Sequence, residues 1–206
     1  VLSAPPSVTA DTGMDVITHA FEALVSVNNN DAADALAEKS LLLAFKYLPF
    51  AFKHGDDTVA REKMHTASCL AGIAFNEAGL GVNHSIAHAL GAQFHIPHGR
   101  ANALLLPHVI RYNAHLRACF GNVPTDAAER YADIARMIGL PHDNIRIAVE
   151  SLIEEIKAFM QKNLSEREYK IICLRYGLLD HIERTQQEVA DKLGKLFMNN
   201  AQYIEK

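Results

Sequence analysis

The chain has 206 residues, 49% of them hydrophobic, so it is long enough to bury a sizeable core. Its net charge of −4 gives no general attraction to nucleic acids or acidic membranes, and no apolar run is long enough to cross a bilayer. Three widely spaced cysteines indicate free thiols in a reducing compartment, which favours a cytoplasmic protein.

The first third of the sequence predicts three helices. Ser, Thr and Pro residues predict a loop or linker over 1–11, and the segment MDVITHAFEALVSV that follows has apolar residues at helical spacing. A second helix is expected to begin at Asp31, as its N-cap, and to end at Pro49. An Ala-rich helix is expected over 59–75, because small side chains allow close packing.

The rest of the chain is also typical of helices. A buried helix bent at Pro107 is expected over 99–113, and AAERYADIARMIGLP predicts a helix that Gly139 and Pro141 end. An apolar stripe with a period of 3.6 residues then runs from Val149 to Met160. Because no segment alternates as a strand does, we predict an all-α fold with a helical C-terminal tail.

A set of metal-ligating side chains comes from three parts of the chain. Asp15 and His19 are four residues apart and share one face of a helix, His84 begins a second cluster, and His98 follows a proline. Three imidazoles and one carboxylate suit Fe(II), Zn(II), Co(II) or Ni(II), and they leave a position free for a substrate oxygen. The alternative is that these are ordinary core or surface histidines.

His88 is a fifth candidate, because it lies one helical turn after His84 and should face the same cavity. It could be a ligand, a proton relay or a packing residue. Histidine titrates near neutral pH, which suits proton transfer.

These residues lie in longer motifs that resemble a known family. The segments TADTGMDVITHAFEALVSV and AGIAFNEAGLGVNHSIAHALGAQFHIPHGRANALLLPHVIRYN, and the helix AERYADIARMIG, resemble the iron-containing (group III) alcohol dehydrogenases. The patterns GMDxxTHxxE, GLGxxHxxAHxLG and PHGxANAxLLPxVxxYN occur in order. The resemblance is to the all-helical, metal-binding C-terminal domain of that family, and it covers about residues 4–162.

The resemblance implies a site and a reaction. Four side chains are implied to hold a divalent metal, usually Fe(II) and sometimes Zn(II): Asp15, His19, His84 and His98. His88 is implied to lie beside the nicotinamide and to relay a proton, and Phe75 to form a wall of the substrate pocket. The implied reaction is hydride transfer between a small alcohol or aldehyde and NAD(H), in a protein that can form homo-oligomers.

The nucleotide-binding half of such an enzyme has no counterpart in this sequence. The Gly79–Gly81 segment lacks the GxxG pattern of a phosphate loop. We therefore expect the chain to bind metal and to use NAD(H) only if a nucleotide-binding domain is supplied. The alternative is a catalytically inactive, helical metal-binding remnant.

The sequence from residue 164 onward has a different character, which predicts a domain boundary between 1–163 and 164–206. LSEREYKIICLRYGLLDHIERTQQEVADKLG resembles region 4 of bacterial sigma factors, a helix-turn-helix that binds promoter DNA. The expected recognition helix is incomplete, and this tail has seven Lys/Arg and seven Asp/Glu residues. A neutral tail favours an amphipathic helical pair over DNA binding.

Overall fold

The computed structural model describes residues 2–94, 96–116, 125–163, 188 and 191. Those residues form helices and no strand, so the predicted all-α fold is confirmed. The helices are α1 (Pro6–Leu24), α2 (Asp31–Lys53), α3 (Thr58–Ala78), α4 (Val82–Phe94), α5 (His98–Asn113), α6 (Asp126–Met137) and α7 (Ile145–Asn163). Within the described ranges, no helix has both the length and the apolar character that a membrane span requires.

The chain divides into two compact units, 1–160 and 161–206. The tail that we predicted over 164–206 lies outside the described residues except at 188 and 191. Its resemblance to a sigma factor module, and the boundary at residue 163, therefore stay predictions.

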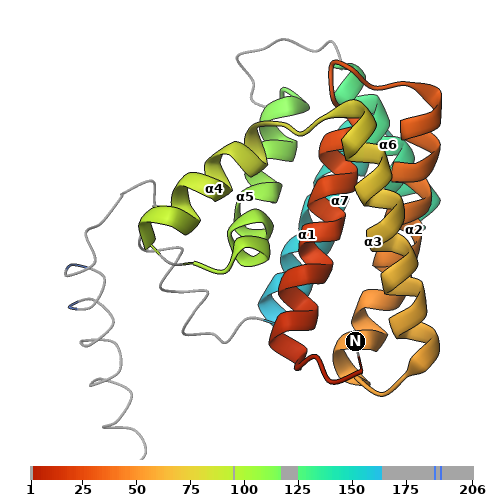
Figure 1. Cartoon of the computed structure of the whole chain (residues 1–206). Helices are drawn as coiled ribbons and strands as arrows, with labels where there is room; N and C mark the ends of the chain where they lie inside the picture. Colours follow the sequence, from red (N-terminus) through yellow and green to blue (C-terminus); the bar gives the residue numbers. More distant parts are fainter. Residues whose placement is uncertain (1, 95, 117–124, 164–187, 189–190, 192–206) are drawn as a thin grey trace, which may run out of the picture. The chain divides into compact units, whose positions relative to one another are not determined.

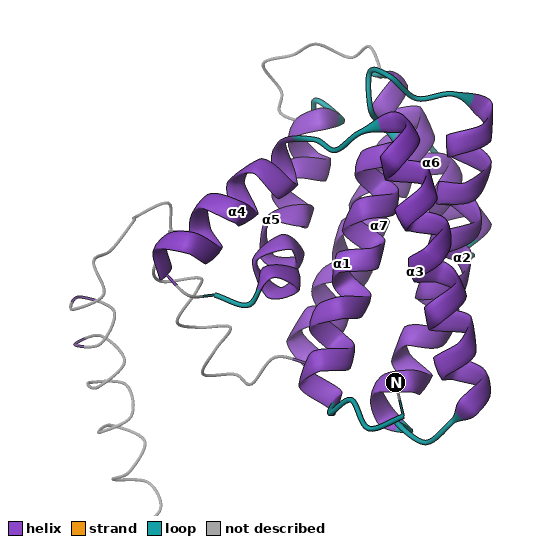
Figure 2. Ribbon diagram, in the orientation of Figure 1, coloured by secondary structure: helices purple, strands orange, loops and turns teal. Residues whose placement is uncertain are grey.

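Helix α1 is the central element of the first unit. It packs against α2 and α3 and also against α5, while α4 packs mainly on α5. Figures 1 and 2 show α1 between the α2–α3 pair and the α4–α5 pair. One face of α1 thus supports the core, and another face meets the two helices that carry the remaining histidines.

Helix α1 begins earlier than the sequence predicted, so the expected loop over 1–11 was wrong from Pro6 onward. Pro5 is the N-cap in an extended conformation and Pro6 is the first helical residue. Proline is favoured there because its missing N–H would have no partner inside the helix in any case. The hydroxyl of Thr9 donates back to the carbonyl oxygen of Pro5 over 3.2 Å, which further ties the first turn together.

Helix α2 differs from its prediction at both ends. Its N-cap is Asn30, whose side-chain oxygen accepts the N–H groups of Ala32 and Ala33, so Asp31 is a helical residue and not the cap. The helix also continues through Pro49 to Lys53. Leu48 and Ala51, on either side of the proline, are buried, and their packing compensates for the lost backbone hydrogen bond.

The core combines small and large buried side chains. Helix α3 buries a row of alanines, and Ser40 of α2 donates a 2.8 Å hydrogen bond to the carbonyl of Ala67 in that row. Phe21 of α1 packs edge-on against Tyr131 of α6, with ring centroids 5.7 Å apart. The predicted apolar stripe of α7 is buried at Val149, Leu152, Ile153, Ile156 and Met160.

Candidate metal centre

The first part of the site is one face of α1. Asp15 and His19 are one turn apart, and the Nδ1 of His19 lies 2.8 Å from the backbone carbonyl oxygen of Asp15. A carbonyl only accepts, so Nδ1 carries the proton and Nε2 keeps the free lone pair. The helix backbone thereby fixes His19 as the tautomer whose free lone pair, on Nε2, a metal can bind.

His84 joins this face from the first turn of α4. Its side chain is 2% exposed, and its Nδ1 lies 2.6 Å from Oε2 of Glu22 on α1. Its Nε2 is buried, has no hydrogen-bond partner, and lies 3.5 Å from Oδ1 of Asp15. Asp15, His19 and His84 each offer one ligand atom, and these three atoms lie within 4.8 Å of one another.

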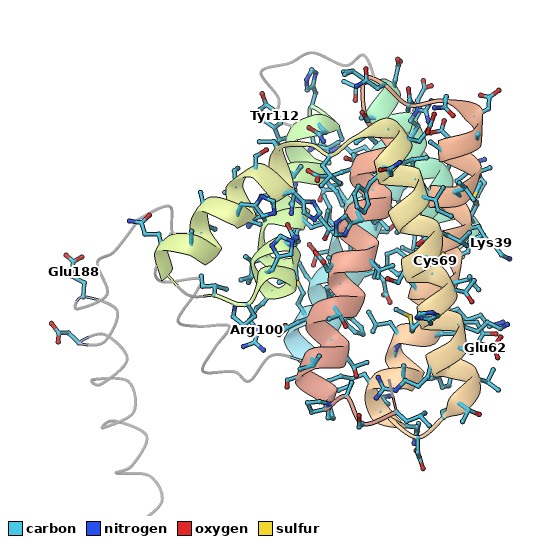
Figure 3. All side chains as sticks on the ribbon, in the orientation of Figure 1. Lys39, Glu62, Cys69, Arg100, Tyr112 and Glu188 are labelled. Carbon is cyan, nitrogen blue, oxygen red and sulfur yellow. The ribbon has the colours of Figure 1, made fainter. Side chains whose placement is uncertain are left out.

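His98 reaches the group because α5 begins there and approaches α1 closely. Pro97 is the N-cap of α5, and a Cβ on Gly99 would collide with the backbone carbonyl of Asp11, so this approach needs glycine. The guanidinium of Arg100, labelled in Figure 3, then pairs with both carboxylate oxygens of Asp11 at 3.1 Å. The Nε2 of His98 lies 3.4 Å from Oδ1 of Asp15, beside the compact group of three.

Asn102 bridges two of these ligand atoms from one turn farther along α5. Its Nδ2 donates to Oδ1 of Asp15 over 2.6 Å and lies 3.0 Å from Nε2 of His98. Its own side-chain oxygen accepts a 2.9 Å hydrogen bond from Nδ2 of Asn83 on α4. Asn102 is fully buried, so helices α1, α4 and α5 meet in one polar network beneath the histidines.

Burial and the neighbouring charges shift the pKa values of three members of the group. Burial opposes ionisation of Asp15, but its contacts with His84, His19 and Asn102 outweigh burial and hold its pKa below the usual value. Burial likewise disfavours the charged form of His84, yet the carboxylates of Asp15 and Glu22 prevail and raise its pKa to about 9. The pKa of His19 is lowered, chiefly by burial.

His88 and Phe75 lie at the edge of this group. The ring of His88 is exposed, with its centroid 6.1 Å from that of His84 and 5.0 Å from that of His98. The ring of Phe75, at the end of α3, is half-buried with its centroid 4.6 Å from that of His19. Both side chains are therefore adjacent to the candidate ligands, and their roles stay predictions.

A family comparison identifies the fold that carries this site. A model of the C-terminal part of the Fe-containing alcohol dehydrogenase family matches residues 9–196. The chain belongs to this family. The predicted family resemblance is confirmed, and the match continues past residue 163.

The curated relatives of this chain include a 1-propanol dehydrogenase, PduQ, of Salmonella typhimurium. It is 53% identical over 164 residues, which are 79% of this chain and 42% of that relative. A solved 1,3-propanediol oxidoreductase superposes with a TM-score of 0.72 at 34% identity, over 93% of this chain and 52% of that one. A sulfoacetaldehyde reductase from Bifidobacterium kashiwanohense, solved with NAD⁺, gives a TM-score of 0.64 at 28% identity, over 95% and 51%. The chain thus spans about two fifths to one half of the length of these relatives.

Two residues of the site were missed by sequence reasoning, although both lie inside the family motifs. Glu22 is the last position of GMDxxTHxxE, three residues after His19, and Asn102 is four residues after His98. Both spacings place the polar side chain on the same helical face as a candidate ligand. A Glu between Phe21 and Ala23 in an apolar run was the available signal for a buried carboxylate with a partner.

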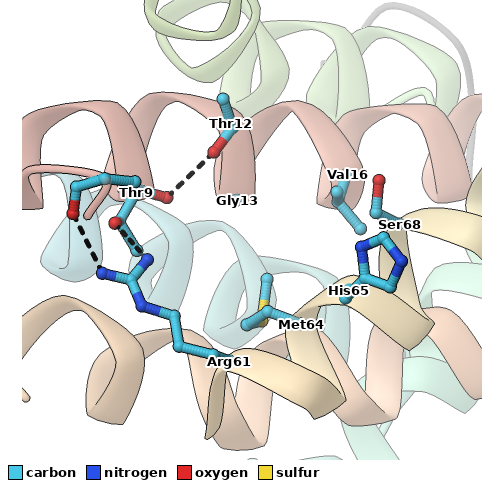
Figure 4. Close-up of a pocket in the computed structure, with 9 residues that line it drawn as sticks. Thr9, Thr12, Gly13, Val16, Arg61, Met64, His65 and Ser68 are labelled. Carbon is cyan, nitrogen blue, oxygen red and sulfur yellow. Dashed lines mark hydrogen bonds between the residues drawn. The ribbon is translucent and has the colours of Figure 1, made fainter. Parts of the chain in front are cut away.

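A separate cavity of about 180 Å³ lies between α1 and α3 (Figure 4), and its lining residues include none of the candidate ligands. The buried guanidinium of Arg61 borders it and donates to the carbonyls of Gly55 and Ala4 and to the hydroxyl of Thr9. These bonds connect the segment before α1 to the start of α3. Arg61 therefore stabilises the fold at this end of the helices.

Proposed function

We propose that this chain supplies the metal-binding half of the active site in an NAD-dependent alcohol dehydrogenase that interconverts small alcohols and aldehydes. The observation that carries the proposal is the buried Nε2 of His84. It has no hydrogen-bond partner, although it lies beside a carboxylate and a second imidazole. A buried nitrogen in this state is costly unless something binds it, and a divalent cation fits the donors around it.

The proposed ligands are Asp15, His19, His84 and His98. Three neutral imidazoles and one carboxylate leave part of the charge of a divalent cation uncompensated, and His98 is the most exposed of the three histidines. An exposed side leaves room for a substrate oxygen, as in catalytic rather than structural sites. When bound, such a metal supplies Lewis-acid activation of an alcohol or carbonyl oxygen.

The neighbouring side chains have proposed roles of their own. His88 is exposed and lies beside His98, so it is placed to move a proton between the site and solvent. Phe75 is proposed to form an apolar wall next to His19, which favours a small alkyl group on the substrate. The PduQ relative is named for 1-propanol, which is a substrate of this kind.

The cofactor assignment rests on relatives rather than on this chain. Fe(II) is the proposed metal because of the family, although the same donors suit Zn(II). NAD(H) is proposed because the sulfoacetaldehyde reductase is solved with NAD⁺, and it would require a nucleotide-binding domain. A cytoplasmic location and homo-oligomer formation are further proposals from the cysteine content and the family, and nucleic-acid binding is not proposed.

The test is the metal content of protein purified without oxygen, beside the double variant His84→Ala/His98→Ala. We expect about one equivalent of Fe or Zn in the parent and little in the variant. A matched control is His65→Ala/His142→Ala, which removes two exposed histidines elsewhere and should keep the metal. Equal, negligible metal in all three proteins would contradict the proposal.

Turnover separates the proposed enzyme from the inactive alternative. Metal-loaded protein is mixed with NADH and propionaldehyde, and loss of NADH absorbance is followed with and without an added nucleotide-binding domain of a relative. NADH oxidation that the double variant lacks supports the dehydrogenase. Metal binding without NADH oxidation in either mixture would favour the helical metal-binding remnant.

A further inference from the structure

We propose that Glu22 is a positioning residue for the metal centre. It fixes the tautomer of His84 and anchors the first turn of α4 to α1. This inference rests on the proposed function, because it assigns to Glu22 the orientation of a ligand of that site. Glu22 contacts Nδ1 of His84, whereas the other ring nitrogen, Nε2, faces Asp15.

The carboxylate of Glu22 is almost fully buried and makes three contacts with α4. Its Oε2 lies 2.6 Å from Nδ1 of His84, and its Oε1 accepts the backbone N–H of Asn83 over 2.6 Å. The backbone N–H of His84 also points to Oε1, at 3.4 Å. The side chain is 4% exposed, so solvent does not replace these bonds.

The backbone of the loop before α4 is shaped to admit this carboxylate. A Cβ on Gly81 would lie 2.8 Å from Oε1 of Glu22, closer than real Cβ contacts. Glycine at this position therefore lets the chain pass over the carboxylate and present the free N–H groups of the first turn of α4. Those groups are unpaired within any helix, and a carboxylate also interacts favourably with the helix dipole there.

The same carboxylate decides which nitrogen of His84 can bind a metal. An ionised carboxylate only accepts hydrogen bonds, so Nδ1 of His84 must carry a proton. The remaining nitrogen, Nε2, is the one that lies 3.5 Å from Oδ1 of Asp15 and lacks a hydrogen-bond partner. When His84 is neutral, as metal binding requires, Glu22 keeps the proton on Nδ1, so the lone pair of Nε2 points at the other ligands, and the charge of Glu22 makes that nitrogen a stronger donor.

The substitution Glu22→Gln tests this selection while keeping the shape of the side chain. An amide has one accepting oxygen and one donating nitrogen, whereas both oxygens of Glu22 accept hydrogen bonds in the parent. If the amide oxygen accepts the hydrogen bond from the N–H of Asn83, the amide NH₂ faces His84 and favours the tautomer that is protonated on Nε2. If the amide flips, its NH₂ faces the backbone N–H, and the anchor of α4 is lost.

The experiment measures Zn(II) affinity of the full chain by competition with a chromophoric chelator, together with thermal stability in the absence of metal. We expect Glu22→Gln to bind Zn(II) about 10–100-fold more weakly than the parent. The control Glu62→Gln changes an exposed carboxylate on α3 and should match the parent. In the Zn(II)-loaded parent, ¹⁵N spectra of the imidazole should show His84 protonated on Nδ1.

Two results would overturn the proposal. One is Zn(II) binding by Glu22→Gln within twofold of the parent. The other is a loss of affinity no larger than the loss of folded protein at the assay temperature, which would make Glu22 merely structural.

A parent that binds no Zn(II) would instead refute the proposed function, and the tautomer assignment would be refuted with it. The anchoring of α4 is then decided separately by amide hydrogen exchange of metal-free protein. Glu22→Ala should speed exchange at Asn83 and His84, and unchanged exchange there would contradict the anchor.

Discussion

The contact between α5 and α1 at Gly99 makes a quantitative prediction. In Gly99→Ala the new Cβ would lie 2.5 Å from the backbone carbonyl carbon of Asp11, and ordinary contact begins near 3.4 Å. The carbonyl oxygen of Asp11 would lie nearer still, so the two helices must separate by more than about 0.9 Å at this point. Overpacking of this kind costs about 1–3 kcal/mol of folding free energy.

The same separation would move a proposed ligand. His98 precedes Gly99 in α5, and metal–ligand distances tolerate errors of only about 0.2 Å. We therefore expect Gly99→Ala to weaken metal binding by about tenfold or more, as supporting contacts of ligands typically do. Because α5 moves away from α1, the paired hydrogen bonds between Arg100 and Asp11 should also weaken.

Gly72→Ala is the matched control, because the same methyl group is added inside α3 with nothing within 4 Å. Alanine is the better helix former, so this variant should gain about 0.5–1 kcal/mol. Urea unfolding of metal-free protein should therefore move in opposite directions for the two variants. A Gly99→Ala protein that is as stable as Gly72→Ala, or binds metal as tightly as the parent, would refute the reasoning about this contact.

Three further predictions follow from local contacts. Asn30→Ala should cost about 1 kcal/mol in urea unfolding, because it removes the cap of α2. His88→Ala should keep the metal and change the pH dependence of any turnover; loss of metal would make His88 a ligand. Folding raises the pKa of His84 from 6.5 to about 9. The charged form of His84 therefore contributes its full stabilisation to metal-free protein below pH 6.5, and this contribution is lost as the pH rises through 9. Thermal melts should show this decline, and calorimetry at pH 7 should detect proton release on metal binding.

The sequence predicted the helical fold because apolar spacing reports which face of each helix is buried. The stripe of α7 illustrates this, since its predicted residues form part of the core. The errors arose where two local rules competed. A proline pair predicts a loop, but Pro6 begins α1. Pro49 lies inside α2 because packing of its neighbours outweighs one lost hydrogen bond.

The candidate site was predictable as a set of ligand types but not as a network. Helical spacing placed Asp15 beside His19, and the motifs placed His84 and His98 with them. Spacing cannot show that Asn102 reaches Asp15 from another helix, since that contact depends on how α5 docks on α1. The partner of a buried polar group depends on tertiary packing, so it is seen only in the structure.

The most direct test of the central claim is X-ray diffraction from metal-loaded crystals, measured on both sides of the absorption edge of the bound metal. The account predicts one anomalous peak, about 2.0–2.2 Å from a carboxylate oxygen of Asp15 and from Nε2 of His19, His84 and His98. A peak elsewhere in the chain, or none in crystals grown with excess Fe(II) or Zn(II), would contradict the assignment of these four side chains.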